Sequence, residues 1–245
     1  AAAVLLLGFV LERHAPTLLL PVFAALTACG LLAMSGFRLP ERPDEAADRP
    51  AEHRSIAAVL RSHPRFALTL LGCMFFFLTH TISNTYMNAL VGKAGGTASA
   101  VGTSLAISAV LELPAMTLVS RLQKRFSLGF FLRFAAGAEV VKFLIFYLAH
   151  SMPFIYLGHC MQFFQFAVYA PATVYYVAAA LPERDQLKGQ SLIYVAGSGL
   201  GGALGNLLGG RLLDRSGIQA ALLLGTVSAA ASLLTFCLST REDSR

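Results

Sequence analysis

The chain has 245 residues, of which 56% are hydrophobic and only 13% are charged. This balance is typical of membrane proteins, and it excludes a soluble globular domain and a disordered chain. The net charge of +6 does not indicate a nucleic-acid-binding protein, because the basic residues are spread over several connecting segments. The four cysteines have no paired spacing, so we expect neither a disulfide framework nor a metal site, and we expect no cofactor.

Seven segments stay apolar for long enough to cross a bilayer. A helix that rises about 1.5 Å per residue needs about 20 residues to cross a hydrocarbon core of about 30 Å. The segments are 17–37, 66–91, 98–119, 128–149, 153–181, 192–213 and 218–238. A shorter apolar stretch, 1–10, we interpret as the end of a further span. The sequence therefore predicts an all-α polytopic membrane protein.

A hydrophilic segment at 38–65 separates the first full span from the other six. It is rich in proline and charge, as solvated linkers are, and residues 55–60 are expected to form a short amphipathic helix at the membrane surface. The connections after residue 65 are short, which favours antiparallel neighbours in one bundle. The predicted units are a partial helical unit at 1–37, a linker at 38–65, a six-helix bundle at 66–239 and a tail at 240–245.

The basic residues predict the orientation of the chain. Thirteen of the 19 Lys and Arg residues lie in or beside the alternate connections that include the linker and the tail, and four lie in the others. Because cytoplasmic loops carry the excess of Lys and Arg, the linker and the C-terminus are predicted to be cytoplasmic. The expected location is the inner or plasma membrane.

Three charged residues lie deep inside predicted spans, where a charge costs about 2.5 to 3.5 kcal/mol. Glu139 and Lys142 are three residues apart on one helix and can pair, so they are either functional or a pair that neutralises itself. Glu112 has no partner on its own helix and needs a proton or a cation such as Lys142. We interpret Glu112 as a candidate coupling group.

Uncharged polar residues recur at helical spacing in 66–91 and in 153–181. The two sets are His80, Ser83, Asn84 and Asn88 in the first span, and Gln162, Gln165 and Tyr169 in the second. Each side chain can be a simple interhelical hydrogen bond, worth about 0.6 to 2 kcal/mol. Their alignment on single helical faces favours the lining of a water-filled cavity instead. His159 is either a hydrogen-bonded structural residue or a proton carrier.

The span 192–213 carries glycine at every fourth position, which lets a neighbouring helix approach closely. These glycines are Gly197, Gly201, Gly205 and Gly209. Residues 197–202 also match G-x-G-x-x-G, but a dinucleotide fold needs a soluble βαβ unit around that motif. Ser198 lies in a sequence similar to the serine motif of rhomboid intramembrane proteases. No histidine follows it to act as its base.

The order of these features resembles the C-terminal half of a major facilitator superfamily transporter, closest to the branch that contains lactose permease and the phenylpropionate permeases. The resemblance covers residues 15–239 and includes the basic turn at 121–125 and the segment 189–194 that opens the glycine-rich helix. It implies the six-helix C-terminal bundle of a twelve-helix fold, preceded by the last helix, and the end of the one before it, of an N-terminal half. The missing N-terminal half is then an expected partner.

The resemblance also implies roles for individual residues. Glu112, in Val110-Leu-Glu-Leu-Pro114, lies at the place of the permease's sugar-binding carboxylate, and Lys142 lies at that of its arginine in the next helix. The segment from His159 to Gln162 is similar to the His-x-x-Glu of the permease's tenth helix. These residues are the expected path for solute and protons.

Together these observations predict a secondary active transporter of a small organic solute of the sugar, nucleoside or aromatic acid class, coupled to protons and working by alternating access. Its expected partners are the solute, H⁺ and the lipid bilayer, without nucleic acid. One alternative is an intramembrane enzyme such as a rhomboid-like protease, which lacks a base near Ser198. The other is a non-transporting helical subunit, which has no need of an ionisable residue such as Glu112 at the midplane. We therefore expect no enzyme activity.

Overall fold

The structure is a computed structural model of the whole chain, and it describes residues 19–35, 55–123 and 125–241. Within these ranges the secondary structure is helical, without strands, which confirms the predicted all-α fold. The apolar stretch 1–10, most of the linker and the end of the tail lie outside the described residues. The predicted span 17–37 is described from Leu19 to Ser35.

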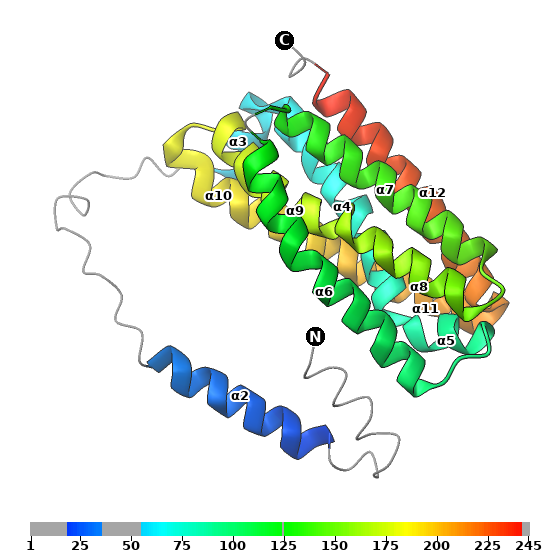
Figure 1. Cartoon of the computed structure of the whole chain (residues 1–245). Coiled ribbons are helices and arrows are strands. Elements are labelled where there is room, and N and C mark those ends of the chain that lie inside the picture. The colour runs from blue at the N-terminus through cyan, green and yellow to red at the C-terminus, as the bar shows by residue number, and fades with distance from the viewer. Residues whose placement is uncertain (1–18, 36–54, 124, 242–245) are drawn as a thin grey trace.

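The described helices are α2 (Leu19–Ser35), α3 (Ile56–Ser62), α4 (Pro64–Thr85), α5 (Met87–Lys93), α6 (Ala98–Leu122), α7 (Leu128–Leu148), α8 (Met152–Cys160), the 3₁₀ turn η3 (Met161–Phe163), α9 (Phe166–Ala180), α10 (Glu183–Tyr194), the π-helical segment η4 (Val195–Gly201), α11 (Gly202–Ser216) and α12 (Ile218–Ser239). From α3 onward they follow one another with short connections. The helices from α4 to α12 form one elongated bundle, in which α7 and α12 lie side by side (Figure 1).

Five of the described helical segments are long and apolar enough to cross a membrane. They are Pro64–Thr85, Ala98–Val119, Met152–Ala180, Glu183–Ser216 and Ile218–Ser239. A sixth predicted span corresponds to α7, which has a suitable length of 21 residues. It carries three charged side chains within the span, Arg133, Glu139 and Lys142. The protein is therefore an integral, multi-pass membrane protein.

The short helix α3 begins where the sequence predicts it. Ser55 is its N-cap, and the Ser55 hydroxyl accepts a hydrogen bond of 3.2 Å from the Ala58 N–H, which satisfies one of the unpaired donors of the first turn. His63 alone separates α3 from α4, which begins at Pro64. A proline is favourable at this first helical position because its missing N–H leaves no donor unpaired.

Two predicted spans are interrupted rather than continuous. Tyr86, with φ −102° and ψ 22°, ends α4 before α5 continues to Lys93. The span 153–181 breaks at η3 and at Gln165, which has φ −100° and ψ −92°, before α9 begins. Hydrophobic periodicity does not reveal such breaks, because the apolar pattern continues on both sides of them.

The glycine-rich segment packs directly on α4. A Cβ atom at Gly205 would lie 2.7 Å from the Leu78 carbonyl oxygen, and one at Gly201 would collide with the Met74 carbonyl. These distances are too short for any side chain at the two positions. Farther along the same face, Gly197 meets Phe77 and Gly209 meets Tyr86. Small residues thus bring the backbones of α4 and the η4–α11 helix into contact.

Two apolar clusters form the core of the bundle, one toward each end. On α7 the first cluster ends at Ala136, and the second begins at Phe143. Along the α8–α9 segment the second cluster includes Ile155, and the first begins at Val168. Between the two clusters the same elements carry polar side chains, so the core contains a polar zone at mid-height.

Candidate functional site

Five buried polar side chains occupy this zone, and we call them the polar layer. They are Glu139 and Lys142 on α7, His159 on α8, Gln162 in η3 and Gln165 directly before α9. Each of them is more than nine-tenths buried. Polar groups at this depth need partners, because an unpaired polar atom in an apolar surrounding is costly.

Lys142 is bound to the interrupted helix. Its ammonium group donates a 3.1 Å hydrogen bond to Oε1 of Gln162, and it lies 5.8 Å from the centroid of the Phe146 ring. The 3₁₀ turn η3 is wound more tightly than an α-helix, so its side chains point in other directions than those of a continuous α-helix would. In this arrangement Gln162 faces α7. The break between α8 and α9 therefore places the hydrogen-bond acceptor of the buried Lys142.

Glu139 lies one turn before Lys142 and is fully buried. Neither of its carboxylate oxygens has a hydrogen-bond partner among the described residues. The sequence allows Glu139 and Lys142 to pair directly, but in this conformation Lys142 donates its hydrogen bond to Gln162 instead. The pair is close without being joined, so the carboxylate is the least satisfied group in the polar layer.

His159 joins three helices. Its Nδ1 lies 2.9 Å from the Ser108 hydroxyl of α6, and its Nε2 lies 3.2 Å from the Met87 sulfur of α5. A neutral ring with the proton on Nε2 satisfies both contacts, since Ser108 can donate to Nδ1 and the sulfur is a weak acceptor. The ring also lies 5.2 Å from that of Phe146. His159 therefore connects α5, α6 and α8 as a structural residue does, and its neutral ring can also accept a proton.

The predicted polar face of the first span is divided in the structure. His80 lies parallel to the Phe166 ring, with 4.4 Å between centroids, and its Nε2 is 3.0 Å from the amide nitrogen of Asn84. Ser83 is buried, whereas Asn84 and Asn88 are exposed. The break at Tyr86 lies between the last two, so the set does not line one internal cavity.

The second predicted face packs mainly against α4. The Gln165 amide nitrogen is 3.5 Å from Nδ1 of His80, and the Tyr169 ring stacks on Phe76 at 3.9 Å between centroids. A small cavity of about 70 Å³ remains beside Tyr169, bounded by Phe77 and Tyr194 among others. It has room for a few water molecules. The water-filled cavity that the sequence predicts is therefore narrow beside Tyr169.

Glu112 lies apart from the polar layer. Its side chain is half-buried on α6 and makes no hydrogen bond or ion pair among the described residues. Ser108, one turn earlier on the same helix, bonds to His159 rather than to Glu112. The structure therefore does not bring Glu112 to Lys142 in this conformation.

Sequence reasoning missed two features of the site. The pairing of Lys142 with Gln162 depends on the 3₁₀ turn, for which the sequence gives no periodic signal. The stacking of His80 on Phe166 joins α4 to the start of α9. The sequence prediction considered only the polar residues of the two spans, and Phe166 is not one of them. The recurrence of aromatic residues at 163, 164 and 166 is the signal that could have suggested it.

Comparisons with known proteins agree with this architecture. A maltose permease of Geobacillus stearothermophilus is 28% identical over 245 residues, which cover 99% of this chain and 61% of the permease. YwbF, an uncharacterized transporter of Bacillus subtilis (strain 168), is 22% identical over 244 residues, which cover 99% of this chain and 60% of that protein. The chain thus spans about three-fifths of the length of these curated relatives.

A solved structure shows the same fold. It is the crystal structure of a bacterial homolog of the human lysosomal transporter Spinster, inward-facing and unoccupied, with a TM-score of 0.55 and 15% identity over 84% of this chain and 53% of that chain. The named relatives are transporters and not enzymes, as the sequence predicts. The MFS_1 like family model matches residues 1–224. Because that match covers most of the chain, the chain belongs to the MFS_1 like family of the major facilitator superfamily.

Proposed function

We propose that the full protein is a secondary active transporter that moves a small organic solute across the cell membrane by alternating access. The observation that carries this proposal is the polar layer, above all the buried Lys142 bound to Gln162 at a break in a membrane helix. Ionisable residues inside a membrane are costly, and they mark the paths of substrates and ions. A packing subunit without transport would need no such group.

Proton coupling is the second part of the proposal. A charged Glu139 without hydrogen bonds is unfavourable in an apolar interior. It has two favourable states, one with a bound proton and one in direct contact with Lys142 after Lys142 leaves Gln162. An exchange between these states links proton binding to the position of α7 relative to η3, which is the kind of bistable element that a coupled transporter requires.

The solute class that we propose first is a sugar. The maltose permease relative supports this class, and so does the chemistry of the surface formed by α4 and α5. Asn84 and Asn88 are exposed amides, the His80 ring lies next to Asn84, and the Phe166 ring stacks on His80. Amides donate to and accept from hydroxyl groups, and aromatic rings pack against the apolar face of a sugar. Nucleosides and aromatic acids are the other classes that this surface suits.

The proposal also states which residues belong to the N-terminal half and which side of the membrane the linker and the C-terminus face. Residues 1–37 belong to the N-terminal half, whose other helices pack against α2. In support, every described side chain of α2 is exposed in this chain, including Leu31, Leu32 and Met34. The excess of basic residues in the linker supports a cytoplasmic linker and C-terminus.

Uptake by proteoliposomes of the full-length protein tests the function. Radiolabelled maltose, a nucleoside and an aromatic acid are offered with and without an inward proton gradient. We expect one class to accumulate against its concentration gradient only when the proton gradient is present. Accumulation that does not respond to the proton gradient would remove the coupling, and the absence of uptake for all three classes would contradict the proposed solute range.

A further inference from the structure

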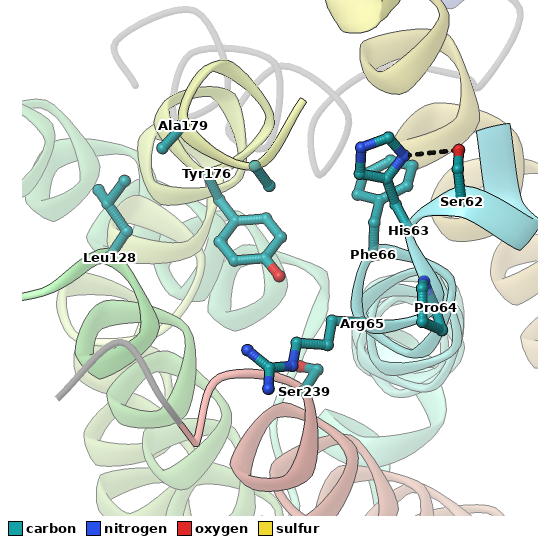
Figure 2. Close-up of a pocket in the computed structure, with 10 residues that line it drawn as sticks. Ser62, His63, Pro64, Arg65, Phe66, Leu128, Tyr176, Ala179 and Ser239 are labelled. Carbon is teal, nitrogen blue, oxygen red and sulfur yellow. Dashed lines mark hydrogen bonds between the residues drawn. The ribbon is translucent and has the colours of Figure 1, made fainter. Parts of the chain in front are cut away.

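Two cavities lie toward the end of the bundle that carries α3, and they differ in polarity. The larger, of about 560 Å³, lies at the α3–α4 junction. Its polar side chains have partners within the protein, since the Ser62 hydroxyl lies 3.0 Å from Nδ1 of His63 (Figure 2), and the Tyr176 hydroxyl lies 3.1 Å from that of Thr69. The smaller, of about 250 Å³, lies between α6 and α7 and is lined by apolar side chains alone. We call this second cavity the phenylalanine groove.

Aromatic rings form the rim of the phenylalanine groove. Phe126, Phe130 and Phe134 are stacked in a row at the start of α7, with 5.0 Å and 5.9 Å between successive centroids. Phe164, at the break between α8 and α9, meets Phe134 edge to face at 6.2 Å. Each of these four rings is 39–45% exposed. The side of α6 from residue 115 to residue 122 forms the opposite wall, so the groove is a slot between two helices.

The dimensions of the groove suit one lipid chain better than another helix. Between residues 115 and 122, α6 rises about 10 Å, and a single leaflet contributes about 15 Å of the hydrocarbon core. Helices in a membrane pack closely where small residues let their backbones approach, whereas bulky rings stand along this rim. A flexible acyl chain can enter between the rings. The groove therefore fits an acyl chain that extends within one leaflet.

Two exposed arginines lie at one end of the groove. Arg121 is in the last turn of α6, three residues after Leu118 of the groove wall, and Arg125 directly precedes Phe126. Neither guanidinium forms an ion pair with another residue of the described ranges. The sequence between Glu112 and Glu139 contains no acidic residue. The mouth of the groove thus offers positive charge to an anionic headgroup.

We propose that the phenylalanine groove binds an anionic phospholipid, with one acyl chain between the rings and the headgroup phosphate at Arg121 and Arg125. Guanidinium groups match the geometry of phosphate oxygens and donate paired hydrogen bonds to them. The predicted cytoplasmic side of this end agrees, because anionic lipids of the cytoplasmic leaflet attract basic residues near the membrane surface. Since Phe163 of η3 lines the groove, a bound chain also packs against the turn whose Gln162 holds Lys142.

Native mass spectrometry of the full-length protein in detergent tests this site, because it counts bound lipids one at a time. Delipidated protein is titrated with dioleoyl phosphatidylglycerol and with dioleoyl phosphatidylcholine, which share their chains and differ in headgroup charge. We expect the first phosphatidylglycerol to bind about tenfold more tightly than the first phosphatidylcholine, since basic residues near a membrane surface favour anionic lipids. Equal affinities would overturn the proposal. So would the absence of a tightly bound lipid, because the N-terminal half would then cover the groove.

Variants with matched controls show whether the lipid binds in this groove. The double variant Arg121→Gln and Arg125→Gln should bring the two affinities to within about threefold of each other, whereas Arg215→Gln, at an exposed position near the end of α11, should keep the preference. Phe130→Ala should weaken the binding of both lipids about fivefold. Phe154→Ala, which removes an exposed ring of α8 outside the groove, should leave it unchanged. An unchanged preference in the arginine variant, or equal effects of the two phenylalanine variants, would exclude the groove.

Photolabelling of the wild type decides the question if the arginine variant does not fold. Phosphatidylglycerol that carries a diazirine in its acyl chain should label peptides that contain residues 115–134 or 163–168, the segments that line the groove. Labels confined to other segments would contradict the proposal.

Discussion

Lys142 has an unusual position for a lysine, since it is almost completely buried between two apolar clusters. Its hydrogen bond to Gln162 satisfies one of its three donors. The adjacent Glu139 carboxylate is without hydrogen bonds among the described residues. Such an incompletely satisfied pair is expensive to keep for stability alone, which favours a functional role for both residues.

The first prediction concerns Glu139. Glu139→Gln keeps the shape of the side chain and removes its ability to bind and release a proton, so uptake driven by a proton gradient should fall at least tenfold. Exchange of labelled for unlabelled solute, which needs no net proton movement, should remain within about threefold of the wild type. Arg133→Gln, which removes a charge from the same helix, is the matched control and should retain driven uptake. Equal loss of exchange and driven uptake in Glu139→Gln would contradict a coupling role.

The second prediction concerns Glu112, which lies apart from Lys142 here. Glu112 can still act if another conformation brings α6 toward the polar layer. In that case Glu112→Gln should abolish driven uptake, and its effect should not add to that of Lys142→Ala, since coupled residues give non-additive effects. The double variant should then be no worse than the poorer single one. Wild-type rate, accumulation and pH dependence in Glu112→Gln would exclude it from both coupling and binding.

At the scale of elements, close helix contact depends on two glycines. Gly205→Ala places a methyl group 2.7 Å from the Leu78 carbonyl oxygen, and relieving this overlap should cost about 1–3 kcal/mol. Gly201→Leu should be worse, because its larger side chain meets the Met74 backbone. We expect a lower melting temperature in detergent and loss of transport in both.

Gly137→Ala is the control for these variants. Gly137 lies within α7, and a Cβ atom there would meet nothing within 4 Å. This change should stabilise the protein by about 0.5–1 kcal/mol, because alanine is the better helix former. If Gly205→Ala behaved in the same way as Gly137→Ala, the glycine spacing would have no role in packing.

The sequence predicts the helices well and their interruptions poorly, for a physical reason. Long apolar runs mark helices in a bilayer because every backbone polar group must be satisfied internally. At the break, the Gln165 backbone keeps local partners, the Met161 carbonyl and the Val168 and Tyr169 N–H groups, and the apolar pattern does not change there. The same limit applies to the site. The charges of Glu139 and Lys142 stand out in an apolar span, whereas the pairing of Lys142 with Gln162 depends on the turn between α8 and α9.

At the scale of the whole molecule, the two ends of the bundle differ. One end carries α3 and the end of α12, and the other carries α5 and the turn at Gly217 (Figure 1). The basic residues around α3 predict that the first end faces the cytoplasm. This prediction places the linker and the end of α12 on the cytoplasmic side of the membrane.

Labelling from outside the cell tests this orientation. After replacement of the native cysteines, a cysteine at Thr97, which is exposed between α5 and α6, should react with a membrane-impermeant maleimide in intact cells. A cysteine at Ala57, exposed on α3, should react only after the membrane is opened, because α3 belongs to the basic linker, which is predicted to be cytoplasmic. The reverse pattern would place the linker outside and overturn the orientation predicted from the basic residues.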